Sequence, residues 1–277
     1  MSDSVTGARV ARKGVSQRGT LRKLYRQSRA ARRAITSFVI IAILWEVIGR
    51  YVITNEALFV PFSSIGAAFT KLMSTGELQK HVQVSVTEFL LGVGVAAAVG
   101  VASGAVLAVK DTLRDYIDPV ISVLYSTPTV ALAPLFILGL GIGLESKAAV
   151  VFLVTVIPVI INTVAGIRAT EQDFIEAARS FGASELQIFQ KILIPAALPF
   201  IITGLRLGVG RGIVGVVVAE LFGARAGLGL LILSTSQSFD PAGLFVAILL
   251  LAFAAVTVIS ILQWLEAAVA PWRKFKV

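Results

Sequence analysis

The chain has 277 residues, of which 56% are hydrophobic and 15% are charged, and its mean hydropathy is +0.87. Soluble proteins contain roughly 45–50% apolar residues, so this composition excludes an ordinary soluble domain and predicts an all-α integral membrane protein. Cysteine is absent, which excludes disulfides, thiolate metal sites and a cysteine nucleophile.

Residues 1–34 form a basic segment that we expect to be a cytoplasmic tail. They hold ten of the 25 Lys and Arg residues and one acidic residue, Asp3. Basic residues interrupt the segment throughout, and no small-residue cleavage site follows an early apolar stretch, which argues against a secretory signal. Two roles stay open: contact with anionic lipid, and a solvated tail that fixes the topology.

A transmembrane domain is predicted over residues 35–277. Six apolar stretches are each near the roughly 20 residues that cross a hydrocarbon layer. They cover about 35–53, 83–109, 119–141, 147–167, 198–222 and 242–265. With both termini in the cytoplasm, the inner segments hold 18 Lys and Arg residues and the outer segments five. This asymmetry follows the positive-inside rule, so we expect both termini to be cytoplasmic.

The first span and the segment after it contain few polar residues that would indicate a functional site. Glu46 and Arg50 lie four residues apart on one helix face, so we expect an ion pair with a structural role rather than a transport role. A short helix is predicted on the outer face from about Ser63 to Gly76. His81, the single histidine, has no second ligand at metal spacing, so we expect it to be exposed and predict no metal site.

Spans two to four contain small and polar residues. Gly100 and Gly104 have the spacing that lets two helices approach closely in lipid. The third span carries hydroxyl groups and a proline that predict the wall of a pathway, at Ser126, Thr127 and Pro128. Asn162 in the fourth span has two open roles, lining the pathway or bonding between helices.

The stretch from Glu176 to Pro199 mixes charged and apolar residues at helical spacing, so we expect it to lie outside the membrane. The spacing from Thr170 to Asp173 and from Ser184 to Gln187 fits two capping boxes, each at the start of a helix. Gly182 between them suits the left-handed backbone that ends a helix. Apolar residues fall on one face of each helix, and Pro195 is expected to end the second. A plain surface hairpin could show the same caps.

The fifth span holds charged residues in an apolar run, at Arg206, Arg211 and Glu220. A charge at the centre of a membrane helix costs about 2.5–3.5 kcal/mol, so these side chains should face the protein interior. The two arginines could contact a passing anion, or they could pair with Glu46, Glu88 or Glu220. The sequence after Glu220, GARAGLGLLI, is expected to fold back as a short outer gate.

The residue inventory gives little support to catalysis. The GxxxxGK[ST] motif is absent, so ATP and Mg²⁺ would have to be bound by a partner, and we expect this chain not to be an enzyme. Its glycine clusters lack the strand, helix and later acidic residue of a dinucleotide site. A single histidine offers little to a zinc site or to histidine-centred nucleophilic catalysis.

The segment EAARSFGASELQIFQKILIP resembles the EAA loop of permease subunits in bacterial ATP-binding-cassette (ABC) importers. The similarity runs from about Ile35 to the C-terminus. The wider context, with GIRAT before the loop and GLRLGVGRGIVGVVVAELFGARAGLGLLI after it, is similar to the branch that imports nitrate, sulfonates, taurine or related solutes. Ile194 departs mildly from the leucine usual before that proline. The resemblance implies that an ATPase subunit docks on residues 170–195, and above all on Glu176, Ala177, Ala178, Gly182, Ala183 and Pro195.

The resemblance also implies a type I ABC importer permease fold, with about six transmembrane helices and a cytoplasmic coupling helix. The chain would form the pathway in a bacterial inner membrane together with a second permease copy, most simply an identical one. Two ATPase subunits would drive it, and an external binding protein would deliver a small solute, anionic if the arginines line the pathway. The alternative is a self-sufficient secondary transporter, which predicts midplane acidic residues and an inverted repeat. We find neither feature clearly in the sequence.

Overall fold

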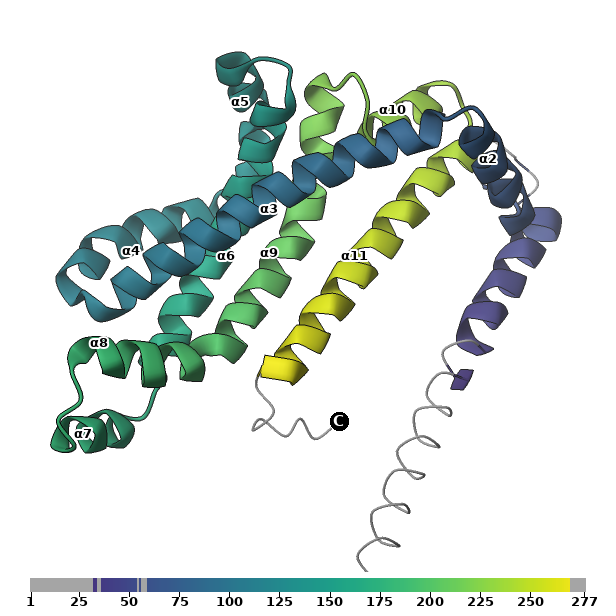
Figure 1. Cartoon of the computed structure of the whole chain (residues 1–277). Helices are drawn as coiled ribbons and strands as arrows, with labels where there is room; N and C mark the ends of the chain where they lie inside the picture. Colours follow the sequence, from purple (N-terminus) through teal and green to yellow (C-terminus); the bar gives the residue numbers. More distant parts are fainter. Residues whose placement is uncertain (1–31, 34–35, 54, 56–58, 270–277) are drawn as a thin grey trace, which may run out of the picture. The chain divides into compact units, whose positions relative to one another are not determined.

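The computed structural model describes residues 32–33, 36–53, 55 and 59–269, and every element among them is a helix (Figure 1). The chain divides into two compact units, Met1–Gly66 and Ala67–Val277. Residues 1–31 and 34 of the predicted cytoplasmic tail and residues 270–277 lie outside the described residues. In chain order the elements are η1 (Ile48–Val52), α2 (Phe62–Ser74), α3 (Glu77–Val109), α4 (Asp111–Ser126), η2 (Thr129–Leu132), α5 (Ala133–Leu140), α6 (Leu144–Arg168), α7 (Gln172–Ser180), α8 (Glu185–Ile188), η3 (Phe189–Leu193), α9 (Ile194–Gly223), α10 (Leu228–Gln237) and α11 (Pro241–Val269).

Unit 1 contains the first predicted span, in which residues 36–47 are helical and continue into η1. Glu46 and Arg50 form the predicted ion pair. The same Glu46 carboxylate accepts a hydrogen bond of 2.9 Å from the Ser63 amide in the first turn of α2. Trp45 stacks on Phe59 with ring centroids 5.3 Å apart. The pair therefore fixes the start of the short helix that follows, which is the structural role predicted for it.

Unit 2 is built around α6, which packs against both α3 and α9. Within their most apolar windows, 61% of α6 is buried but only 11% of α11. Gly100 of α3 lies so close to α6 that an added Cβ would stand 2.8 Å from Val159 Cγ1, and one on Gly104 would stand 2.7 Å from Thr163 Cβ. Helix association in lipid depends on such close van der Waals packing. The predicted contact role of these two glycines is confirmed.

The predicted third span at 119–141 is not one continuous helix. α4 and the η2–α5 segment meet at an angle of 86°. Thr127 adopts an extended backbone just before Pro128, which is the conformation that a following proline favours. The span at 119–141 stays a prediction, and the structure shows that Pro128 ends α4 within it.

Among the described residues, four helices are long and apolar enough to cross a membrane, and the bent pair would make a fifth. They are α3, α6, α11 and the continuous helix from Glu185 to Gly223. The chain is thus an all-α, multi-span protein. α10 is the short helix that folds back after the fifth predicted span.

Candidate functional site

The predicted docking loop forms a helical hairpin in unit 2. At the end of α7 the amides of Gly182 and Ala183 donate to the carbonyls of Arg179 and Ala178, at 2.9 and 3.0 Å. These two bonds form a Schellman motif, which requires a left-handed residue, and Gly182 has φ +78°. The predicted break at Gly182 is therefore confirmed.

One of the two predicted capping boxes is present. The Gln187 amide donates to Ser184 Oγ at 3.3 Å, and the Ser184 amide donates to Gln187 Oε1 at 2.8 Å. The box expected at Thr170 was wrong, because α7 begins at Gln172 without a side-chain cap. The Thr170 amide instead donates to Ile167 in the last turn of α6, so this residue belongs to the preceding helix.

Ion pairs hold the loop in shape. Arg179 of α7 donates to both carboxylate oxygens of Glu185 of α8, at 3.1 and 3.3 Å. These hydrogen bonds raise the pKa of Arg179 above its ordinary value. Arg168 at the end of α6 donates to Asp111 at the start of α4, at 2.6 Å. The hairpin is thus braced internally, and the helix that leads into it is tied to its neighbour.

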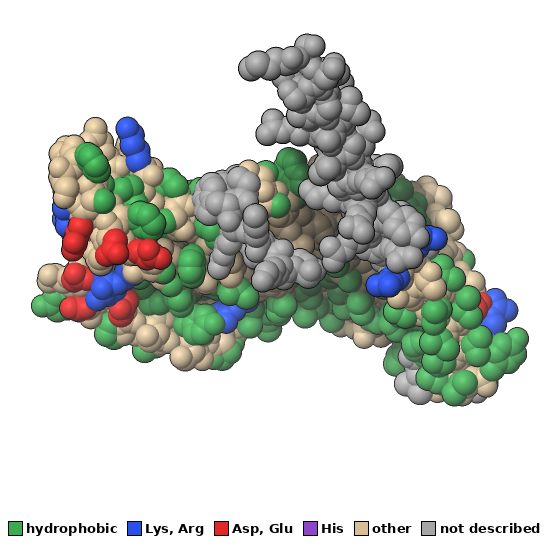
Figure 2. All heavy atoms as spheres, turned by 90° about the horizontal axis from the view of Figure 1, so that it is seen from below, with side chains coloured by type: hydrophobic (Ala, Val, Ile, Leu, Met, Phe, Trp, Pro, Cys, Tyr) green, Lys and Arg blue, Asp and Glu red, His purple; other side chains and the backbone are tan. Residues whose placement is uncertain are grey.

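The loop exposes large apolar side chains. Phe181 is 91% exposed, Leu186 64% and Phe174 59%. Glu176 and Ala177 are also exposed. Charged side chains gather at the end of the molecule that carries α7 and α8 (Figure 2, left). An exposed apolar group framed by charged residues is typical of a protein-docking surface.

The helix that leaves the loop does not stop at Pro195 as predicted. α8 passes through the π-helical turn η3 directly into α9, giving one helix from Glu185 to Gly223. Pro195 stands in the first turn of α9, where the preceding π turn accommodates a residue without an amide hydrogen. The docking loop is therefore continuous with a membrane-spanning helix.

The predicted pathway residues lie at several places in unit 2. Ser126, Thr127 and Pro128 are exposed at the break after α4. Arg211 of α9 lies over the ring of Tyr125 beside that break, 4.4 Å from the ring centroid. Asn162 donates to the Pro158 carbonyl of its own helix at 2.8 Å, and is half-buried.

Arg206 pairs with a residue that the sequence did not suggest. Its Nη2 donates to Glu266 Oε2 of α11 at 2.5 Å. Pairing with Glu46, Glu88 or Glu220 was the alternative to contact with an anion, and the structure gives a different acidic partner. Whether Arg206 also meets a solute stays a prediction.

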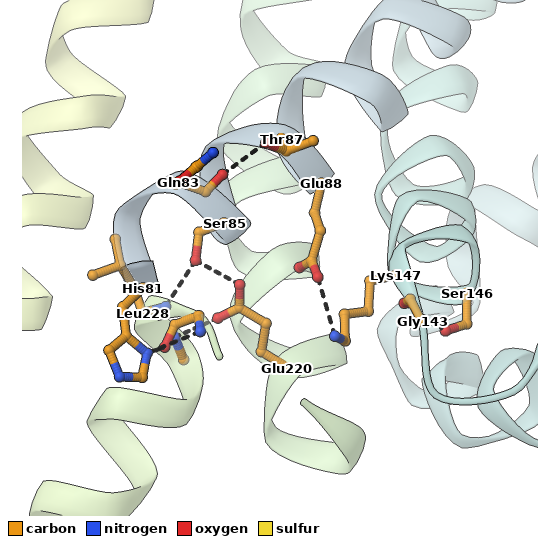
Figure 3. Close-up of polar contacts among 12 residues, drawn as sticks. His81, Gln83, Ser85, Thr87, Glu88, Gly143, Ser146, Lys147, Glu220 and Leu228 are labelled. Carbon is orange, nitrogen blue, oxygen red and sulfur yellow. Dashed lines mark hydrogen bonds and ion pairs between the residues drawn. The ribbon is translucent and has the colours of Figure 1, made fainter. Parts of the chain in front are cut away.

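Glu220 is fully buried and its carboxylate has two donors (Figure 3). Ser85 Oγ donates to Oε1 and the Gly229 amide donates to Oε2, both at 2.5 Å. His81, which we expected to be exposed, is 8% exposed, and its Nδ1 accepts from the Gly227 amide at 2.9 Å. The prediction failed because the turn before α10 packs onto α3 and covers the ring. These contacts fasten the expected gate segment to the helix bundle.

A second buried ion pair was missed at sequence level. Lys147 Nζ of α6 lies 3.1 Å from Glu88 Oε1 of α3, and both side chains are at most 5% exposed. Lys147 is enclosed near the start of α6. The sequence did contain an indication of this pair, because Glu88 and Lys147 carry opposite charges in different apolar spans. No group of His, Cys, Asp or Glu within the described ranges is placed to bind a metal ion.

Comparison with known proteins places these features in a family. Residues 92–274 match the model described as "Binding-protein-dependent transport system inner membrane component". The chain is 34% identical over 235 residues to a protein named as an aliphatic sulfonates transport permease, SsuC of Bacillus subtilis (strain 168), with 85% of each chain covered. It is 33% identical over 196 residues to the taurine transport system permease protein TauC of Escherichia coli (strain K12), with 71% of each covered.

A solved structure of the MetNI methionine ABC transporter in an inward-facing conformation shares the fold. The TM-score is 0.63 at 18% identity, over 69% of this chain and 95% of that chain. The predicted type I ABC importer permease fold is therefore confirmed. The chain belongs to the family of binding-protein-dependent transport system inner membrane components, the permease subunits of ABC importers.

Proposed function

We propose that this permease conducts a small anionic solute, such as a sulfonate, nitrate or a related compound, across an inner membrane. Family membership implies an ATPase and a binding protein as partners. The names of SsuC and TauC refer to aliphatic sulfonates and taurine, all of which carry a sulfonate group. In the proposed assembly two permease copies, most simply identical, enclose the pathway, and two ATPase subunits bind and hydrolyse ATP with Mg²⁺.

The observation that carries this proposal is the exposed apolar surface of the predicted docking loop, residues 170–195, which we call the coupling loop from here on. Phe181 extends almost wholly into solvent at a turn fixed by the Schellman motif. Burying one large apolar side chain in a partner stabilises the complex by about 1.5–3 kcal/mol. Glu176 stands exposed on α7, the helix that ends just before Phe181, and offers a charge to a basic residue of the ATPase. In this proposal the contact with the ATPase subunit is made by the predicted docking residues Glu176, Ala177, Ala178, Gly182, Ala183 and Pro195.

The continuity of the loop with α9 gives the proposed coupling a physical route. A rigid helix carries a displacement of α8 into the membrane, because η3 joins α8 to α9 without a loop. α9 carries Arg206, Arg211 and Glu220, and Arg211 lies beside the break after α4. ATP-driven closure of the ATPase subunits would thus reach the proposed pathway wall at Ser126, Thr127, Pro128 and Asn162. In this orientation both termini are cytoplasmic.

Co-expression of the tagged chain with its ATPase and binding protein tests the proposal. The wild-type complex should co-purify in detergent and hydrolyse ATP, and vesicles should take up solute only when ATP is supplied. Phe181→Ser and Glu176→Lys should each lose the ATPase subunit while the permease remains monodisperse, since both side chains are exposed. Glu145→Lys, the same charge change at the opposite end of α6, is the matched control and should retain the complex.

Two results would contradict the proposal. If both loop variants kept normal ATPase association and uptake, the loop would not be the docking surface. If the chain purified alone and moved solute without ATP, it would be a secondary transporter.

A further inference from the structure

Unit 2 contains a cavity of about 510 Å³ that the coupling loop does not touch. Three segments line it: the first half of α3, the turn from α5 into α6, and the loop after α9. Its polar lining residues are Lys80, Gln83, Thr87, Glu88, Lys147 and Arg225. A volume of this size lies within the range of about 300–1,000 Å³ typical of small-molecule sites.

The lining carries an excess of positive charge. Lys80, Lys147 and Arg225 are cationic and Glu88 is anionic, which leaves two net positive charges on the lining. Among the described residues Lys80 and Arg225 form no ion pair, and both are exposed. Two cations without an acidic partner attract an anion into the concavity that they line.

The inner end of the cavity is formed by a buried ion pair. Lys147, 4% exposed, is held by Glu88 at 3.1 Å (Figure 3). An ammonium group has three donors, and this ion pair uses one of them. Glu88 Oε2, also buried, has no hydrogen-bond partner within the described part of the chain. The Lys147 ammonium therefore keeps two donors for an anion that enters the cavity, whereas the Glu88 carboxylate only accepts hydrogen bonds and serves to hold the ammonium in place.

The cavity lies at the end of α6 away from the coupling loop. Lys147 and Arg168 are 21 residues apart on this helix, which corresponds to about 32 Å at about 1.5 Å per residue. The coupling loop follows Arg168 directly. If ATPase subunits dock on that loop, the cavity lies on the side of the membrane from which a binding protein delivers solute.

We propose that this cavity is an entry site that receives the anionic head of the solute, with Lys80 and Arg225 as its outer ligands and Lys147 as its inner one. The assignment rests on the proposed function for its direction of transport, and it names the recognised chemistry as a sulfonate-like or nitrate-like anion. Arg206 is already neutralised by Glu266, whereas Lys80 and Arg225 keep their charge for the solute.

Trifluoromethanesulfonate, followed by ¹⁹F NMR, is a suitable probe because it presents the sulfonate group whatever the natural solute is. Titrated against the full chain in a neutral detergent, it should show saturable line broadening that ethanesulfonate reverses and uncharged dimethyl sulfone does not. Lys80→Gln and Arg225→Gln should each weaken binding about five- to tenfold, the effect of removing one partly solvated charge. Lys71→Gln removes an exposed charge on α2 that does not line the cavity, and should leave binding unchanged.

Three results would overturn the entry site. Wild-type protein without saturable broadening would exclude it, and an equal loss in Lys71→Gln would show unspecific attraction to a basic protein. In nanodiscs, loss of the signal when phosphatidylglycerol replaces phosphatidylcholine would assign the cavity to a lipid headgroup. Glu176→Lys should bind the probe normally, so failure of the docking loop and failure of this cavity give different results.

Discussion

The ion pair between Arg206 of α9 and Glu266 of α11 allows a quantitative test of what the membrane arginines do. Arg206 Nη2 and Glu266 Oε2 are 2.5 Å apart, and the side chains are 31% and 6% exposed. With an effective dielectric constant of about 20, two unit charges at this distance attract by about 7 kcal/mol. Desolvation offsets most of this attraction, and removing one partner of a buried pair costs about 3–5 kcal/mol.

Arg206→Met and Glu266→Gln should therefore each lower the free energy of unfolding, by about 2–3 kcal/mol because the arginine is partly exposed. The double variant leaves no unpaired charge and should lose no more than either single variant. The resulting coupling energy would be about 2 kcal/mol or more, measured by equilibrium unfolding in mixed detergent micelles. Simple addition of the two losses would refute the pair as a stabilising contact.

Transport by the double variant separates the two roles of Arg206. If the arginine only joins α9 to α11, uptake in vesicles should recover together with stability. If it contacts the solute, uptake should stay low although stability has recovered. Arg211→Met is the matched comparison, since its guanidinium lies over Tyr125 and has no carboxylate partner among the described residues. Its loss of stability should be about 1 kcal/mol, typical of a cation–π contact.

Three further substitutions test the packing. Gly100→Ala should lower the free energy of unfolding by about 1–3 kcal/mol in the same assay, because the new Cβ would stand 2.8 Å from an α6 side chain. Gly94→Ala is the control: its Cβ would have no atom within 4 Å, so the loss should be less than about 0.5 kcal/mol. Ser184→Ala removes a cap worth about 1 kcal/mol, so amides in the first turn of α8 should exchange faster with deuterium. Gly227→Ala should abolish monodisperse protein, because the glycine has φ +138° and its new Cβ would collide with the Glu220 carboxylate; normal yield would contradict the observed packing.

The features that the sequence predicted correctly depend on contacts between near neighbours. Gly182, Ser184 and Gln187 lie within six residues, and their turn and cap follow from local hydrogen bonds. The pair of Glu46 with Arg50 spans one helical turn. Thr170 has the same local signal as Ser184, but the end of α6 uses its amide, so the competing helix decided the outcome.

Long-range partners could not be predicted in the same way. His81 and Gly227 are 146 residues apart, and Arg206 and Glu266 are 60 residues apart. Apolar periodicity shows that a membrane charge must face the protein, but it does not fix how two helices rotate about each other. The sequence therefore predicted that Arg206 pairs or binds an anion, and it gave the wrong list of acidic partners.

The bend after α4 shows that local sequence does not determine the path of the backbone either. Pro128 and its hydroxyl neighbours were recognised as unusual inside a span, yet a membrane proline can either kink a helix or end it. The choice depends on whether packing supports an extended Thr127, which the residues nearby do not determine. The sequence therefore located the unusual proline, and the structure adds the 86° angle between the two helical parts.

The distribution of charge within unit 2 supports an anion pathway that begins at the outer cavity. An uncompensated charge inside a membrane protein is costly, and the structure pairs two of its buried carboxylates with cations, Glu88 with Lys147 and Glu266 with Arg206. Glu220 forms no ion pair among the described residues and accepts two hydrogen bonds instead. Lys80 and Arg225 lie where water reaches them, so they stay charged without an internal partner. A solute anion leaving a binding protein would meet these free cations first, and the paired charges farther in would accept it only by exchanging partners. If ATPase subunits dock on the coupling loop as proposed, ATP hydrolysis would supply the free energy for such an exchange.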